Sequence, residues 1–239
     1  MTEPASGTLG PLDVTGRVAR LRALFDAAGP DDAPVDALLV TAPANIRWLS
    51  GFTGSAGLLL VTPSLAMLTT DGRYRTQSSQ QLEAAGVGAE IEIHVAGAQG
   101  QREALVAASS GVRSLGLEAD HVTWSGQRSW EELFAAAQLA PTRGLVESLR
   151  VVKDAGEVAR MERAASIADG ALAAAVPLLV AVGRPTKARS TGATLTEAQF
   201  AAALDHAMRE RGAEASAFET IVASGANSAK PHARPGDRL

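Results

Sequence analysis

The sequence contains no cysteine, which excludes disulfide bridges, cysteine nucleophiles and thiolate metal sites. Aromatic residues make up only 4% of its 239 residues, so a stacking platform for nucleic-acid bases is not expected. Neither sign of charge dominates, because 22 Lys and Arg residues stand against 26 Asp and Glu residues, for a net charge of −4. No nucleic-acid partner is therefore expected.

Long apolar runs are also missing. Residues 1–22 contain no apolar core of a secretory signal. The longest apolar run, residues 171–182, spans 12 residues and contains Pro177, whereas a bilayer crossing needs about 20. We expect a cytoplasmic protein with no membrane partner.

What is present is an alternation of helical and strand patterns, at 46% hydrophobic residues. Residues 1–12 are polar and interrupted by prolines, and we expect a loose tail there. Residues 13–145 predict an α/β domain with a mixed sheet covered on both faces. Helices are expected near residues 18–25, 43–48, 73–85, 101–109 and 123–138, and strands over 37–40, 57–62, 66–70, 90–95 and 115–117.

The last segment, residues 146–239, has a different pattern. Asp154 and Glu157 form a capping-box-like start for a long helix, which Pro177 is expected to interrupt. A polar stretch over 183–194 then predicts a surface loop.

A second helix follows that loop. Thr196 and Gln199 form its capping box, and Gly212 ends it. Residues 218–223 give the only expected strand of the segment. Because one strand has no sheet to pair with, the second domain is expected to be incomplete.

Most catalytic signatures are absent: the sequence has no HExxH, GxSxG or GxxxxGK[ST] motif. The glycine-rich stretch over 51–57 precedes a strand, and a phosphate loop should follow one, so tight turns and close packing are favoured there. Residues 71–74 (DGRY) favour an ion-paired turn with a tyrosine anchor. The acidic pair Glu131 and Glu132 is expected on a solvated helix face.

The four histidines differ in their surroundings. His94 is expected as a packed or edge residue of a strand, and His206 on the solvated side of a helix. His121 follows Asp120 in a loop, where a structural polar role is favoured over acid–base chemistry. His232 follows the expected strand and a turn of small residues, which is where substrate-facing groups tend to lie.

Four stretches resemble the Xaa-Pro aminopeptidases (aminopeptidase P) of the creatinase/prolidase/methionine aminopeptidase-like metallopeptidase family. Residues 45–55 (NIRWLSGFTGS) and 70–74 (TDGRY) are similar to the N-terminal domain of these enzymes. Residues 149–154 (LRVVKD) with Glu157 resemble the start of the catalytic domain, and 218–232 (FETIVASGANSAKPH) its first active-site strand and loop.

The resemblance implies a creatinase-like N-terminal domain over 13–145, followed over 146–239 by the incomplete first part of a pita-bread catalytic domain. It implies release of the residue that precedes proline in a peptide, usually with two divalent metal ions, often manganese. His232 matches the histidine beside the metal centre that contacts substrate or the tetrahedral intermediate, so it is the expected catalytic and substrate-binding residue. Phe218 matches a position that lines the apolar pocket for the substrate side chain.

The family's metal ligands, two aspartates, a histidine and two glutamates, follow the Pro-His loop, whereas this sequence ends seven residues after His232. We therefore expect the N-terminal portion of such an enzyme, with no metal bound by this chain and no activity of its own. The alternatives are a metal-free peptide-binding or assembly module, or a prolidase or creatinase relative. The resemblance also makes a homo-oligomer plausible.

Overall fold

A computed structural model describes residues 9–28, 33–183 and 195–237. The chain divides into two compact units, Leu9–Gly156 and Glu157–Leu239, and each unit is described separately. Residues 1–8 of the tail expected over 1–12, and residues 184–194 of the loop expected over 183–194, lie outside the described residues. Residues 9–12 carry no helix or strand assignment.

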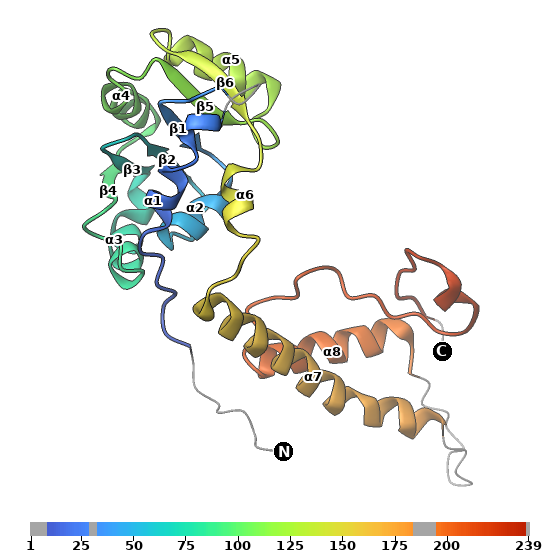
Figure 1. The fold of residues 1–239 in the computed structure, drawn as a ribbon. Coiled ribbons are helices and arrows are strands. Elements are labelled where there is room, and N and C mark those ends of the chain that lie inside the picture. Colours follow the sequence, from blue (N-terminus) through green and yellow to red (C-terminus); the bar gives the residue numbers. More distant parts are fainter. Residues whose placement is uncertain (1–8, 29–32, 184–194, 238–239) are drawn as a thin grey trace. The chain divides into compact units, whose positions relative to one another are not determined.

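The unit Leu9–Gly156 is built on one six-stranded mixed sheet with the strand order β4-β3-β2-β1-β5-β6 (Figure 1). The hairpin β2–β3 is antiparallel, as is β1–β2, whereas β1–β5, β3–β4 and β5–β6 are parallel. The strands are β1 (Ala37–Val40), β2 (Gly57–Val61), β3 (Ala66–Thr70), β4 (Glu92–Val95), β5 (Ser114–Glu118) and β6 (Gln138–Thr142).

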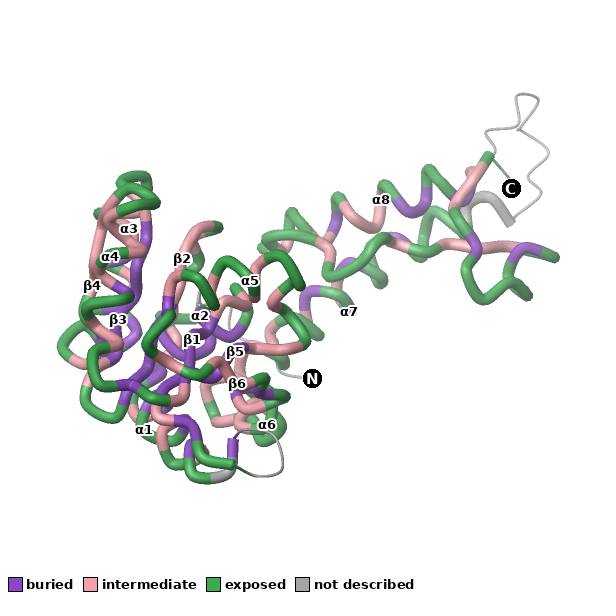
Figure 2. Tube along the Cα trace, turned by 90° about the horizontal axis from the view of Figure 1, so that it is seen from above, coloured by how far each residue is buried: buried purple, intermediate pink, exposed green. Residues whose placement is uncertain are grey.

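Helices cover both faces of this sheet, as the alternating pattern predicts. One core cluster joins alternate residues of β1, such as Leu38, to α1, α2, α3 and α6. The other joins the residues between them, such as Leu39, to α4 and α5. Buried residues therefore run along the whole of β1 and β3 (Figure 2). The helices are α1 (Arg17–Arg22), α2 (Pro43–Ser50), α3 (Arg75–Ala84), α4 (Ala98–Ala108), α5 (Trp124–Leu133) and α6 (Leu145–Leu149), with short 3-10 turns η1 (Phe25–Ala27) and η3 (Gly72–Tyr74).

The glycine-rich stretch after α2 is a tight turn packed on an aromatic ring. Gly51 ends α2 with φ +75°, a conformation that favours glycine. A Cβ added at Gly54 would lie 2.2 Å from Cζ of Phe52, whose ring is buried. The interpretation as turn and close packing, rather than a phosphate loop, is confirmed.

The edge strand β6 was not predicted. The sequence pattern extends a helix over 123–138, whereas α5 ends at Leu133 and a strand follows at Gln138–Thr142. Pro141 obscures this strand in the sequence because proline lacks an amide hydrogen and is confined to sheet edges. At the outer edge of the sheet, next to β5 alone, Pro141 costs no ladder hydrogen bond.

The unit Glu157–Leu239 contains α8 (Glu197–Glu210), the 3-10 turn η4 (Gly225–Ala229) and all of the long helix α7 (Ala155–Gly183) except its first two residues, which belong to the unit Leu9–Gly156. The expectation that Pro177 interrupts the first helix is wrong, because α7 continues through it to Gly183. The lost hydrogen bond and the ring clash cost about 3 kcal/mol. A helix of 29 residues can tolerate this cost at one position.

Helix α7 is also long and apolar enough over Ala155–Val180 to cross a membrane, by length and composition only: its apolar stretch has a mean hydropathy of 1.5, and 11% of that stretch is buried. The 12-residue apolar run considered in the sequence is therefore part of a longer apolar helix. One such helix is weak evidence for a span, because core helices of soluble proteins can be equally long and apolar.

The strand expected over 218–223 is wrong. Within the described part of the unit, these residues carry no strand or helix assignment. The β-branched pattern of Thr220, Ile221 and Val222 favours extended backbone, but a strand forms only when a second strand supplies its hydrogen bonds.

Candidate functional site

Helix α8 begins with the capping box predicted from the sequence. The side chain of Thr196 accepts a hydrogen bond from the backbone N–H of Gln199, and the Gln199 side chain accepts one from the N–H of Thr196. These bonds satisfy free amides at the helix start. They fix the backbone at the first helical residue, Glu197, whose exposed fraction is only 3%.

The carboxylate of Glu197 gathers the loop 224–236 around itself. Oε1 accepts hydrogen bonds from the backbone N–H of Ser224 at 2.7 Å and from its hydroxyl at 2.9 Å. Oε2 accepts from Nδ2 of Asn227 at 3.1 Å and from the backbone N–H of Gly236 at 3.3 Å. A backbone bond from Ala198 N–H to Gly236 O runs beside them. Both ends of the loop are thus attached to the first turn of α8.

Hydrogen bonding sets the charge state of this group. The backbone N–H of Ser224 is the main cause that holds the pKa of Glu197 below its ordinary value, with further bonds from Ser224, Asn227 and Gly236, while desolvation opposes the shift. A carboxylate that accepts several N–H and O–H bonds favours its ionised form. Glu197 is therefore an anion at neutral pH.

His232 lies on the loop that Glu197 holds. The turn η4 and backbone bonds from Lys230 to Asn227 and from Ala233 to Lys230 shape the segment just before and around it. Asn227 and Ala233 are buried, whereas His232 is exposed. The loop therefore has buried anchors on both sides of an imidazole that faces solvent.

Phe218 lies on the preceding segment, which a second carboxylate of α8 holds. Oδ1 of Asp205 accepts hydrogen bonds from the hydroxyls of Thr220 at 2.5 Å and Ser216 at 3.2 Å. The Phe218 side chain between them is 77% exposed. Helix α8 thus holds the segments of both residues that the resemblance indicates, Phe218 and His232. Among the described residues, these two side chains do not contact each other.

The other three histidines lie in structural surroundings. His94 is on the edge strand β4, and His206 is exposed on α8, 3.3 Å from Glu210. Nδ1 of His121 lies 3.0 Å from the hydroxyl of Thr41. The placements of His94 at a sheet edge and of His206 on a solvated helix face are confirmed. The structural polar role of His121 stays a prediction.

A cavity of about 180 Å³ lies where β1, β5 and β6 end, beside Glu118, His121 and Glu147. Glu118 lines it but is already engaged: its carboxylate accepts from the N–H and hydroxyl of Thr41, the N–H of Ala42 and Nδ2 of Asn45. These four bonds fill the acceptor positions of a carboxylate. Glu118 therefore fastens the start of α2 to β5.

The buried Asn45 explains part of the motif at 45–55. Its Nδ2 also donates to Glu147 at 2.6 Å, and its Oδ1 accepts from Arg150 at 2.9 Å. The motif therefore joins α2 to β5 and to the segment around α6. Its role here is to hold the N-terminal unit together.

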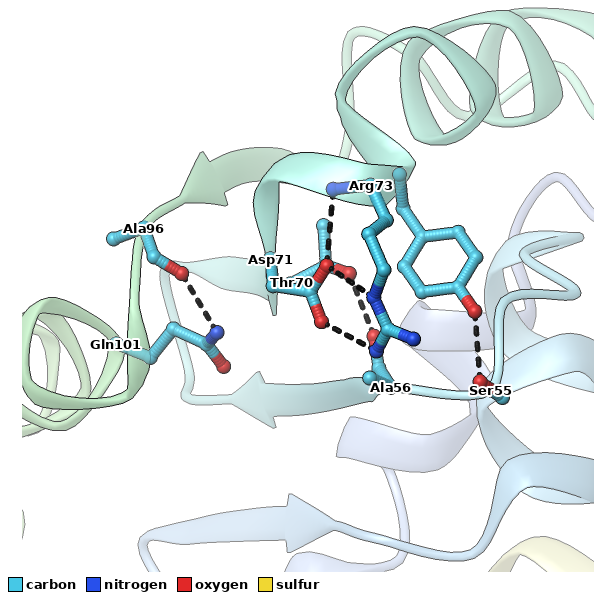
Figure 3. Close-up of polar contacts among 8 residues, drawn as sticks. Ser55, Ala56, Thr70, Asp71, Arg73, Ala96 and Gln101 are labelled. Atoms are coloured by element: carbon cyan, nitrogen blue, oxygen red, sulfur yellow. Dashed lines mark hydrogen bonds and ion pairs between the residues drawn. The ribbon is translucent and has the colours of Figure 1, made fainter.

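The DGRY stretch is an ion-paired turn, as predicted (Figure 3). Asp71 caps η3 by accepting from the N–H of Arg73, and its carboxylate pairs with the Arg73 guanidinium at 2.8 and 3.0 Å. The Arg73 side chain is the main cause that lowers the pKa of Asp71. The hydroxyl of Tyr74 lies 2.7 Å from that of Ser55, which joins this turn to the glycine-rich one.

Comparisons with known proteins agree with this arrangement. Residues 17–152 match the Creatinase/Prolidase N-terminal domain, and residues 159–239 match metallopeptidase family M24. The chain belongs to the creatinase/prolidase family. The predicted α/β mixed-sheet domain, followed by the first part of a pita-bread domain, is confirmed with it.

Several relatives of this family are similar along most of the chain. It is 34% identical over 223 residues to the uncharacterized peptidase YqhT of Bacillus subtilis, covering 93% of this chain and 57% of that protein. It is 34% identical to the Xaa-Pro dipeptidase from Bacillus anthracis, with TM-score 0.77, covering 95% of this chain and 57% of that one. The X-Pro aminopeptidase from Thermotoga maritima MSB8 is 29% identical, with TM-score 0.71, covering 85% of this chain and 55% of that one. The chain spans little more than half the length of these relatives.

The metal ions that the family name implies do not fit the residues at hand. Within the described ranges, no group of three or more His, Asp or Glu side chains is placed to hold a metal ion. Glu197 and Glu118 are surrounded by N–H and O–H donors, which need the carboxylate oxygens as acceptors. Hard cations need several free oxygen ligands together, and neither site offers them.

Sequence reasoning missed the roles of Glu197 and Asp205. Glu197 carries one signal, an acid directly after a helix cap, which normally indicates only a favourable helix dipole contact. Asp205 carries none, because an acid in mid-helix is usually solvated. Their partners lie 11 to 39 residues further along the chain, and only folding brings them together.

Proposed function

We propose that this chain is the N-terminal portion of a metal-dependent Xaa-Pro aminopeptidase, which releases the residue preceding proline from a peptide. The observation that carries the proposal is the loop 224–236, which attaches to Glu197 at both ends and leaves His232 exposed. Membership of the creatinase/prolidase family and the match to family M24 support it. Relatives named Xaa-Pro aminopeptidase and Xaa-Pro dipeptidase support the substrate class.

His232 and Phe218 carry the substrate contacts in this proposal. The imidazole of His232 can donate or accept a hydrogen bond, which suits contact with the substrate or with the tetrahedral intermediate at the scissile carbonyl. Phe218 offers an aromatic surface for the apolar side chain of the substrate. Both side chains are accessible on this chain.

The complete enzyme is proposed to use two divalent metal ions, manganese in the first instance. Such ions activate a water molecule and polarise a carbonyl. Because the described residues hold no group suited to a metal ion, we propose that residues outside this chain supply the ligands. The chain by itself is then inactive.

A peptidase assay tests this directly. The purified chain is incubated with manganese and a tripeptide with proline second, and the released amino acid is measured. No release above the blank is expected, whereas the protein translated from the reading frame continued past codon 239 should release it. Release by the 239-residue chain alone would overturn the inactivity, and none by the continued protein would overturn the function.

The second candidate function is a metal-free peptide-binding or assembly module. The exposed apolar side chains of Phe218 and Ile221, 77% and 56% exposed, favour it, because exposed apolar surface marks interaction sites. Calorimetric titration of the chain with Xaa-Pro peptides separates the two. Saturable binding without turnover, unchanged when the reading frame is extended, supports the module.

Substrate length separates aminopeptidase from its nearest relatives. A prolidase takes dipeptides, so activity of the continued protein on Xaa-Pro dipeptides but not on longer peptides would assign it there. Turnover of creatine instead would assign it as a creatinase. We propose the aminopeptidase, on the resemblance of residues 45–55 and 70–74.

We also propose a cytoplasmic location and a homo-oligomer for the complete protein. Cell fractionation tests the location against the apolar helix α7. Light scattering of the continued protein tests the oligomer.

A further inference from the structure

The two segments that carry Phe218 and His232 are attached to one helix by two carboxylates. Glu197 and Asp205 are eight residues apart on α8, which places them about 12 Å apart along the helix axis. Each carboxylate holds one segment, and the exposed side chain lies between its anchor points. We propose that Glu197 and Asp205 are positioning residues, which fix the His232 loop and the Phe218 segment on α8.

Glu197 encloses the His232 loop from both directions along the chain. Ser224 and Asn227 precede His232 and Gly236 follows it, and all three donate to the same carboxylate. Both oxygens are used. Because hydrogen bonds to a charged acceptor are stronger than neutral ones, this one side chain closes a 13-residue loop at its two ends.

Asp205 encloses Phe218 more simply. The two hydroxyls that it accepts from belong to Ser216 and Thr220, two residues on either side of Phe218. Both donate to Oδ1 alone. An asparagine at this position can therefore keep the same acceptor, whereas a glutamine at position 197 must turn an NH₂ group toward a donor.

Side-chain hydrogen bonds are needed to hold residues 218–224, because the backbone of this segment forms no strand. Residues 218–224 have no strand assignment and so no ladder of hydrogen bonds. A segment without such a ladder loses little by moving unless side chains attach it. The two carboxylates supply that attachment, at the two positions where the proposed substrate contacts lie.

The inference rests on the proposed function only for what the positioned residues do. The positioning itself is measured on the 239-residue chain, by amide hydrogen exchange read by NMR and by the imidazole shifts of His232 and His206. Variants are Glu197→Gln, Asp205→Ala and Asp205→Asn. Glu210→Gln is the matched control, because Glu210 lies on the same helix and is exposed.

In Glu197→Gln we expect the amides of Ser224 and Gly236 to exchange about tenfold faster or more, and the His232 shifts to move while those of His206 stay. Asp205→Ala should loosen residues 216–220 and leave 224–236 unchanged. Asp205→Asn and Glu210→Gln should resemble the parent chain in amide exchange and in the His232 shifts; the His206 shifts are not compared in these two variants, because His206 follows Asp205 and lies 3.3 Å from Glu210.

Equal acceleration throughout α7, α8 and both segments would overturn the inference, because it would mean general destabilisation. Unchanged exchange at Ser224 and Gly236 would overturn it as well. In the continued protein, Glu197→Gln and Asp205→Ala should each lower kcat/KM, whereas the control Glu210→Gln should not. If that protein has no turnover while the exchange pattern holds, the proposed function fails and the positioning stands.

Discussion

Arg17 and Asp154 form an ion pair of 2.6 Å across 137 positions of sequence. Arg17 is at the start of α1 with a side chain only 1% exposed, whereas the Asp154 side chain is 40% exposed. Nη1 of Arg17 also donates to the backbone oxygen of Trp48, and its guanidinium lies 4.4 Å from the centre of the Trp48 ring. The pair therefore connects the first helix of the N-terminal unit to its last residues.

The pair should be asymmetric in its contribution to stability. Arg17→Ala leaves a cavity beside the Trp48 ring and removes the hydrogen bond from Nη1 to the Trp48 carbonyl oxygen, so we expect a loss of about 3 kcal/mol in the free energy of unfolding. Asp154→Ala should cost about 1 kcal/mol, because water can reach the exposed side of the pair. Urea unfolding followed by Trp fluorescence measures both. Equal losses would contradict this asymmetry.

Glu118 should matter to stability rather than to catalysis. Glu118→Ala leaves the amides of Thr41 and Ala42 and the side chain of Asn45 without their acceptor, so we expect a loss of about 2 to 3 kcal/mol. Glu132 lies exposed on α5, so Glu132→Ala is the control, with a change within about 0.5 kcal/mol. The same urea titration measures both variants. If the two lost equally little, the four hydrogen bonds would not hold α2.

Gly54 should not accept a side chain. The Cβ of Gly54→Ala would meet the Phe52 ring, and displacing this buried ring should cost about 1 to 3 kcal/mol. Gly72 is the matched control, because a Cβ there has open space and its φ is not positive. Gly72→Ala should leave the melting temperature nearly unchanged. Calorimetry compares them, and similar melting temperatures would exclude the packing explanation.

The contribution of ionised Glu197 to folding stability should be lost at acid pH. Its folded pKa lies below the ordinary 4.5, so its stabilising contribution is fully present above the unfolded pKa and is lost as pH falls through the folded pKa. Glu197→Gln resembles the protonated form. The stability difference between parent and variant should therefore be largest at neutral pH and shrink below about pH 4.5, as measured by denaturant titrations followed by circular dichroism. A difference independent of pH would show that the charge is unimportant.

Local sequence patterns predicted those elements that depend only on residues close together in the chain. The capping box of Thr196 and Gln199, the strands of the β2–β3 hairpin and the Asp71–Arg73 turn form from residues a few positions apart. The segment 218–223 failed because a strand depends on a partner, and β6 was missed because Pro141 is tolerated only at an edge. The expected interruption at Pro177 was wrong because a 29-residue helix keeps its other backbone hydrogen bonds when one is lost at the proline.

By itself, the sequence determined the fold class, the order of most elements and the stretches that identify the family, because these depend on periodicity, caps and short motifs. Only the tertiary structure decided what Glu197, Asp205, Glu118 and Asn45 do. Their partners lie far along the chain, and an acidic residue in a sequence looks the same whether it is solvated or accepts four hydrogen bonds. Burial and distance separate those cases, and both arise only when the chain has folded.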